Sequence, residues 1–119
     1  VSSKNVLRGI HGDPETWKLI SCLVGKIYVA VVDCDADSKN FGKWQSFVLS
    51  DENWQQVLIP PKRGNSYLTL SEQSVFHYKQ STYYGQAKQF TYKWNDPRFK
   101  IAWPVENPII SERDKLIGA

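Results

Sequence analysis

His11 is the residue best placed for chemistry in this sequence, because of the residues around it. It lies in the segment VLRGIHGD (residues 6–13), where a predicted strand ends and a loop begins. Strand ends often carry catalytic groups, and an imidazole titrates near neutral pH, so the chemistry open to it is proton transfer. The neighbouring Arg8 is suited to binding phosphate oxygens. A lone histidine is more often structural, so both interpretations stand at this point.

Metal chemistry is poorly supported by the sequence. The only other histidine, His77, is far from His11 in the chain, and the two form no HxH pair. Cys22 and Cys34 show neither CxxC nor zinc-ligand spacing. We therefore expect no metal site. The two cysteines form either a disulfide or two buried reduced thiols, and the second interpretation is simpler.

The elements that must position these residues are short strands, since helical periodicity is almost absent. Gly25 indicates a tight hairpin, and residues 35–40 and 60–65 are expected to be polar loops. The tail from Trp103 should be irregular and end in a helical turn over 112–116. Many short strands at this spacing predict an all-β antiparallel sandwich, barrel or jelly roll. The predicted strands are 6–10, 18–24, 26–33, 44–49, 55–59, 66–70, 74–79 and 89–93, with a short one at 100–102.

Alternation along the strand at 74–79 places Tyr78 and Phe76 on one face. Val75 and His77 share the other face. We expect Tyr78 to point inward, either as a core aromatic or toward a cavity, and His77 to be structural.

Length and composition suggest one domain of ordinary type. The chain has 119 residues, 41% hydrophobic and 13% aromatic, with a net charge of +3 that is too mild to indicate nucleic acid binding. It contains no long apolar stretch and no signal peptide, which predicts a cytoplasmic protein that is not bound to a membrane. The chain begins at Val1 and has no Met, so either an initiator was removed or the sequence begins inside a longer protein.

An ordered set of motifs resembles the nucleotide-sugar 3,5-epimerases of the dTDP-4-dehydrorhamnose type. The resemblance covers nearly the whole chain, but the family's N-terminal stretch, which contributes a strand exchanged across a dimer, is missing. We therefore expect a fragment of a homodimeric protein. The segments that carry the resemblance are VLRGIH (6–11), KLI (18–20), SKNFGKW (38–44), IPP (59–61), YK (78–79), WNDP (94–97), WP (103–104) and ISERD (110–114).

The resemblance implies a cupin-type jelly roll that needs neither cofactor nor metal. It implies that His11 is the base that removes a proton beside a sugar ketone, and that Asp114 holds its imidazole. Lys18 matches the cation near the ketone oxygen, and Tyr78 matches the acid that returns a proton to the opposite face. Arg8 matches a residue that binds the diphosphate of the nucleoside-diphosphate sugar. Without the resemblance, Asp114 and Lys18 would be interpreted as solvated surface charges.

The sequence also departs from the family pattern. Asn65 occupies the place of a second active-site histidine, so we expect it to bind substrate rather than act as a base. Val29 replaces an aspartate, and Gly12 and Asp13 replace a common Tyr-Gln pair. These changes are similar to a branch that acts on GDP-linked 4-keto heptoses. A non-catalytic sugar-binding cupin and a sugar 3,4-ketoisomerase are the alternative functions.

Overall fold

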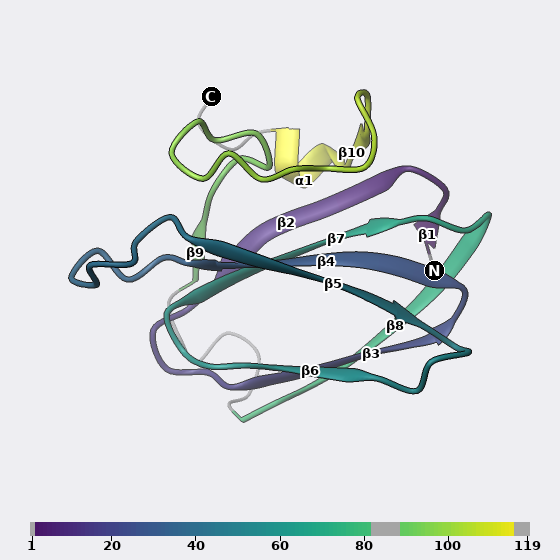
Figure 1. The fold of residues 1–119 in the computed structure, drawn as a ribbon, viewed down its shortest axis with the longest axis horizontal. Coiled ribbons are helices and arrows are strands. Elements are labelled where there is room, and N and C mark those ends of the chain that lie inside the picture. The colour runs from purple at the N-terminus through teal and green to yellow at the C-terminus, as the bar shows by residue number, and fades with distance from the viewer. Residues whose placement is uncertain (1, 82–88, 116–119) are drawn as a thin grey trace.

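Two β-sheets stacked face to face contain nearly all of the regular structure (Figure 1). The computed structural model describes residues 2–81 and 89–115. In chain order the elements are β1 (Ser2–Ser3), β2 (Val6–Gly12), β3 (Lys18–Val24), β4 (Lys26–Asp33), β5 (Trp44–Ser50), β6 (Gln56–Ile59), β7 (Arg63–Thr69), β8 (Gln73–Gln80), β9 (Phe90–Thr91), β10 (Ile109–Ile110) and α1 (Glu112–Lys115).

The order of strands decides which segments meet. One sheet has the order β1-β8-β3-β6, and the other has the order β10-β2-β7-β4-β5, with β9 also paired to β2. Among the described strands only β10 pairs in parallel, with β2. This is the predicted all-β sandwich. It brings the last element, α1, beside one of the first strands, β2, at the edge of the larger sheet (Figure 1).

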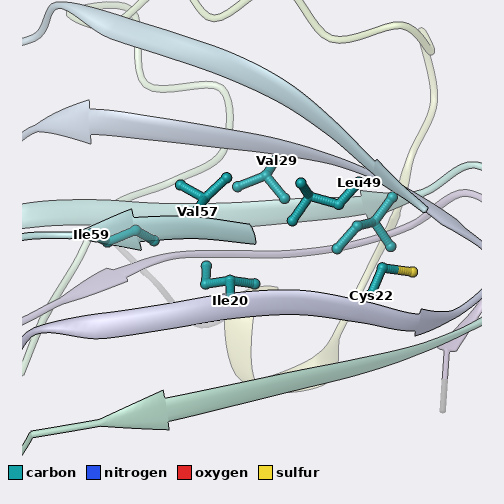
Figure 2. Packing of buried hydrophobic residues seen from close by; sticks show 7 residues of the cluster. Ile20, Cys22, Val29, Leu49, Val57 and Ile59 are labelled. Atoms are coloured by element: carbon teal, nitrogen blue, oxygen red, sulfur yellow. The ribbon is translucent and has the colours of Figure 1, made fainter. Parts of the chain in front are cut away.

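The central core lies between the sheets, where Figure 2 shows side chains from both sheets facing each other. Successive strand residues point to opposite faces, so Ile27 and Val29 of β4 both face inward. Full burial of such a side chain contributes about 1.5–3 kcal/mol, and Ile20→Ala should cost about 2–5 kcal/mol. The cluster consists of Ile20, Cys22, Ile27, Val29, Leu49, Val57 and Ile59.

A second cluster covers the opposite face of the larger sheet. Val32 and Ile10 point away from the central core and pack with Cys34 and with Phe99 from the C-terminal segment. Burial there raises the pKa of the Cys34 thiol to about 11. Cys22 belongs to the inner cluster, and both cysteines are free and buried, which confirms the interpretation as reduced thiols.

The predicted strands agree with the observed ones except in four places. Of the predicted strand 89–93, only Phe90–Thr91 form a strand, β9. Residues 100–102 form no strand. Residues 63–65, expected in a loop, begin β7, because Arg63 and Asn65 pair with Asp33 and Val31 of β4. The two-residue strands β1 and β10 were not predicted. The predicted helical turn is found as α1, although its last predicted residue, Leu116, lies outside the described residues. Within the described ranges no helix is long and apolar enough to cross a bilayer.

Candidate active site

A pocket of about 280 Å³ opens between the two sheets on the side of β2 and β8. It brings together all six residues singled out from the sequence, which lie on β2, β3, β7, β8 and α1. Their roles remain predictions, but the fold places them around one cavity. The lining residues are Arg8, His11, Lys18, Ile20, Asn65, Tyr67, Phe76, Tyr78, Gln80, Gln89, Ser111 and Asp114.

His11 and Asp114 are in direct contact in this pocket. The Nε2 atom of His11 lies 2.8 Å from Oδ1 of Asp114, and their side chains are 17% and 3% exposed. The other carboxylate oxygen, Oδ2, accepts hydrogen bonds from the backbone N–H of Gly9 at 3.1 Å and from the hydroxyl of Ser111 at 2.8 Å. The carboxylate therefore has a fixed orientation, in which Oδ1 lies next to the imidazole.

Ser111 positions Asp114 because it caps the short helix α1. Its Oγ accepts a hydrogen bond from the backbone N–H of Asp114 at 3.2 Å, and its carbonyl accepts one from Lys115 at 3.0 Å. A serine followed three residues later by an acidic residue is a sequence signature of a helix start. Ser111 was not predicted as a site residue, although this pattern in the sequence marks it.

Gly9 is required where β2 passes the carboxylate. Its φ of +122° lies in a region that favours glycine, and a Cβ there would meet the Cβ of Ser66 at 2.5 Å. The pairing of β2 with β7 also shifts register between Arg8 and His11. This irregularity turns the strand so that the N–H of Gly9 and the ring of His11 both reach Asp114.

Lys18 and Asn65 connect the two sheets across the pocket. The Nζ of Lys18, at the start of β3, donates a hydrogen bond to Oδ1 of Asn65 at 3.3 Å. Asn65 is also paired directly with His11 in the ladder between β7 and β2. Asn65 therefore contacts Lys18 through its side chain and lies next to His11 through the strand pairing.

The loop before Lys18 is held by Asp13, whose side chain is almost fully buried. Its Oδ1 accepts hydrogen bonds from the backbone N–H groups of Glu15 and Thr16 at 2.9 and 2.6 Å. Burial alone would raise the pKa of Asp13. The hydrogen bonds from residues 15 and 16, together with the positive charge of Lys18, outweigh it and lower that pKa. Asp13 is therefore ionised at neutral pH, and its hydrogen bonds fix the loop that leads into β3.

Three aromatic rings line one wall of the pocket. Phe76 and Tyr78 come from β8 of the smaller sheet, and Tyr67 comes from β7 of the larger sheet. Tyr67 and Phe76 stack with their centroids 4.4 Å apart, and the rings of Phe76 and Tyr78 are 5.6 Å apart. Tyr78 lines the pocket as the alternation predicted, but it is 47% exposed and so lies at the mouth rather than in the core. Burial raises the pKa of the Tyr67 phenol.

Arg8 lines the same pocket and is held from the first strand. Its Nε donates a hydrogen bond to Oγ of Ser2 at 3.1 Å. A guanidinium has further N–H groups on its two terminal nitrogens. Arg8 therefore retains donors with which to bind an oxyanion while Ser2 fixes its direction.

Some residues of the site were not identified from sequence. The two-residue alternation that places Asn65 and Tyr78 inward also places Tyr67 and Gln80 inward, so these two could have been predicted. Gln89 had no comparable signal. His77 is exposed and outside the pocket, and Val29 is fully buried in the core. Over residues 2–81 and 89–115 no group of three His, Cys, Asp or Glu side chains is arranged to hold a metal.

The fold and this geometry define a cupin-like β-sandwich whose cavity holds a histidine–carboxylate pair opposite a lysine and a tyrosine. The model of the family dTDP-4-dehydrorhamnose 3,5-epimerase matches residues 1–118. The chain is 37% identical to the dTDP-4-dehydrorhamnose 3,5-epimerase of Shigella flexneri, over 95% of this chain and 64% of that protein. The chain belongs to this family, and it spans less than two thirds of that relative's length.

Solved structures agree with this assignment. The crystal structure of dTDP-4-dehydrorhamnose 3,5-epimerase from Elizabethkingia anophelis superimposes with a TM-score of 0.89 at 35% identity, over 97% of this chain and 66% of that one. The dTDP-6-deoxy-D-glucose-3,5-epimerase of Legionella pneumophila, in complex with dTDP-4-keto-L-rhamnose, superimposes with a TM-score of 0.88 at 34% identity, over 96% of this chain and 62% of that one. The resemblance seen in the sequence motifs is thereby confirmed for the family and for the fold.

Proposed function

We propose that the protein containing this chain is a nucleotide-sugar epimerase that inverts C3, C5 or both in a nucleoside-diphosphate 4-keto-6-deoxy sugar. The observation that carries the proposal is the 2.8 Å contact between His11 and Asp114, inside a pocket that also holds Lys18 and Tyr78. Membership of the family supports the reaction class. The complex of the Legionella relative with dTDP-4-keto-L-rhamnose supports the substrate class.

His11 begins the reaction by removing a proton from the carbon next to the ketone. The C–H bond breaks, its electron pair forms an enolate, and the proton passes to the imidazole. The carboxylate of Asp114 lies 2.8 Å from Nε2 of His11, so its negative charge stabilises the imidazolium formed. A base of this kind contributes about 10²–10⁴-fold to the rate.

Lys18 stabilises the charge that develops on the ketone oxygen. A cation placed where charge appears in the transition state lowers the barrier more than one that binds the ground state. Its hydrogen bond to Asn65 keeps the ammonium directed across the cavity. Asn65 also binds substrate, and Arg8 binds the diphosphate through its remaining N–H groups.

Tyr78 completes the inversion by giving a proton to the opposite face of the same carbon. His11 belongs to the larger sheet and Tyr78 to the smaller one, so they approach a bound sugar from opposite walls of the pocket. After turnover the imidazolium and the phenolate exchange protons with solvent and return to their starting states. These roles require neither cofactor nor metal.

Solvent deuterium incorporation tests the proposal. The intact protein, given a 4-keto nucleotide sugar in heavy water, should incorporate deuterium at C3 or C5. A protein that binds the sugar but exchanges no carbon-bound hydrogen is the non-catalytic cupin. Label that appears only with movement of the carbonyl from C4 to C3 identifies a ketoisomerase instead.

The proposal leaves two features of the substrate to be determined, namely its nucleotide base and the number of carbons in its sugar. dTDP- and GDP-linked ketones should be compared, and hexoses should be compared with heptoses, because Asn65, which lines the pocket, stands in place of the usual histidine. We also propose that the intact protein is a cytoplasmic homodimer. Sedimentation of that protein tests the dimer, and a monomer that is fully active would contradict it.

A further inference from the structure

Tyr67 is a partly buried residue of the pocket to which the proposed reaction assigns no role. It lines the pocket beside Arg8 and stacks on Phe76, with the ring centroids 4.4 Å apart and an angle of 13° between the planes. Stacking explains the ring, since a phenylalanine would stack in the same way. It does not explain the hydroxyl, because a phenol that is removed from water needs a hydrogen-bond partner. The polar neighbours of the hydroxyl therefore decide what it does.

Strand pairing places Tyr67 directly beside Arg8. The two residues are opposite each other in the ladder between β2 and β7. Both line the pocket, so their side chains leave the larger sheet on the same face, and residues in this position have Cβ atoms about 4.5–5.5 Å apart. The next pair along the ladder is His11 with Asn65. One step of the ladder thus carries a guanidinium and a phenol, and the next carries the imidazole and an amide.

Ser2 connects the phenol to the guanidinium. Its Oγ accepts a hydrogen bond from Nε of Arg8 at 3.1 Å, and its side chain also hydrogen-bonds the phenol of Tyr67. Ser2 is only 7% exposed, and it belongs to the smaller sheet because it pairs with Ser74 of β8. Arg8, Ser2 and Tyr67 therefore form one hydrogen-bonded chain that joins the two sheets at the wall of the pocket.

The phenol of Tyr67 is a neutral donor at physiological pH. Burial raises its pKa, and the negative charge of Asp114 acts in the same direction, while Arg8 and Ser2 oppose them. A hydroxyl both donates and accepts, so the phenol can accept from Ser2 and still donate its own proton. Ser2 is suited to be that donor, because its oxygen already accepts from a cation and hydrogen bonds in a chain strengthen one another.

We propose that Tyr67 is a further substrate-binding residue, whose hydroxyl donates a hydrogen bond to the diphosphate beside Arg8. Ser2 donates its proton to the phenol oxygen and accepts from Nε of Arg8, so it sets the direction of both groups. The proposal rests on the proposed function, which assigns the diphosphate to Arg8. Phosphate oxygens accept strong hydrogen bonds because they are charged. The ladder step of Arg8 and Tyr67 is therefore the anion end of the pocket, and the step of His11 and Asn65 is the sugar end.

The test measures the dissociation constants of dTDP and GDP, which carry the diphosphate without the sugar, by titration calorimetry of the intact protein. Tyr67→Phe keeps the ring that stacks on Phe76 and removes only the hydroxyl. The dissociation constant of the nucleotide that the wild type binds more tightly should rise about tenfold, because a hydrogen bond to a charged group is lost. KM for the keto sugar of that nucleotide should rise by a similar factor, with a smaller effect on kcat.

Two further variants control for nonspecific and indirect effects. Tyr28→Phe removes the hydroxyl of another tyrosine of the larger sheet, which donates to the carbonyl of Ala102 at 2.7 Å outside the pocket, and it should leave the dissociation constant unchanged. Ser2→Ala removes the connection to Arg8. In that background Tyr67→Phe should still raise the dissociation constant by about threefold or more, since the phenol contacts the ligand itself.

Three results would overturn the inference. Unchanged binding in Tyr67→Phe would leave the residue with packing alone. No effect of Tyr67→Phe in the Ser2→Ala background would mean that the phenol acts only by orienting Arg8. A loss seen with the keto sugar but not with the nucleoside diphosphate would place the hydroxyl at the sugar. If the wild type binds a nucleoside diphosphate but incorporates no deuterium, the proposed function fails, and the same dissociation constants still decide on Tyr67.

Discussion

The imidazole of His11 and the carboxylate of Asp114 lie 2.8 Å apart although they come from opposite ends of the chain. The connection depends on β10, which pairs in parallel with β2 and delivers α1 to the edge of the larger sheet. Gly9 and Ser111 then fix the carboxylate by hydrogen bonds to its second oxygen. His11, Asp114, Gly9 and Ser111 are therefore linked by direct contacts, with the carboxylate of Asp114 at the centre.

Asp114→Asn should lower the rate of deuterium incorporation about 10²–10⁴-fold while the protein stays folded. An amide has nearly the same shape but cannot stabilise the imidazolium, and it can hold the wrong tautomer of His11. His11→Asn should abolish incorporation. Rates are followed by NMR, and circular dichroism checks the fold. A rate in Asp114→Asn within threefold of the wild type would refute the role of the carboxylate.

Tyr78→Phe should separate proton exchange from inversion. His11 remains able to remove a proton and return deuterium to the same face, so label should enter with retention of configuration. Inversion should fall by about 10²-fold or more, since the acid on the other face is lost. The readouts are deuterium content and the stereochemistry of the product.

The control for Tyr78 is the adjacent residue of β8. His77 is exposed and lies outside the pocket, so His77→Ala should change neither exchange nor inversion. Wild-type inversion in Tyr78→Phe would show that another group delivers the second proton.

The strands could be predicted largely from sequence because two-residue alternation is a local property. That pattern predicted that Tyr78 points inward, and it left open whether the ring lies in the core or faces a cavity. The partnership of His11 with Asp114 could not be predicted from spacing, because it depends on the pairing of β10 with β2 across the length of the chain. Only the family resemblance pointed to it.

Long-range pairing also explains where the strand predictions failed. The paired prolines 60 and 61 suggested a loop over residues 60–65, but pairing with β2 on one side and β4 on the other makes residues 63–69 a central strand. Tertiary pairing outweighs local turn propensity there. Conversely, residues 100–102 join no sheet, and Ile101 packs instead against the second cluster, which contains Ile10, Val32, Cys34 and Phe99.

Lys18 and Asn65 should show coupled effects on the reaction. Asn65→Ala removes one acceptor for Nζ of Lys18, so the ammonium is directed less firmly and kcat should fall more than KM rises. Because the two residues act together, the effect of Lys18→Met and Asn65→Ala combined should be smaller than the sum of the single effects, with a coupling of about 0.5–3 kcal/mol. Additive effects on kcat/KM would mean that the hydrogen bond does not matter for catalysis.

Asp33 should make the stability of the fold sensitive to acid. Burial by itself would raise its pKa, but hydrogen bonds from Asp35, Ser38 and Arg63 outweigh it and hold the pKa below its usual range. A lowered folded-state pKa gives stability that is present above about pH 4, the pKa in the unfolded chain, and is lost as pH falls through the folded value. Asp33→Asn should therefore destabilise the protein at pH 7 by about 1–3 kcal/mol.

The difference between wild type and Asp33→Asn should shrink as the pH is lowered below 4, because the wild-type carboxylate then becomes neutral as well. Urea unfolding at a series of pH values measures it. Asp37→Asn is the matched control, since Asp37 is an exposed residue of the same loop and should change stability little at any pH. A constant difference between wild type and Asp33→Asn from pH 7 to pH 3 would mean that packing around Asp33, and not its charge, stabilises the loop.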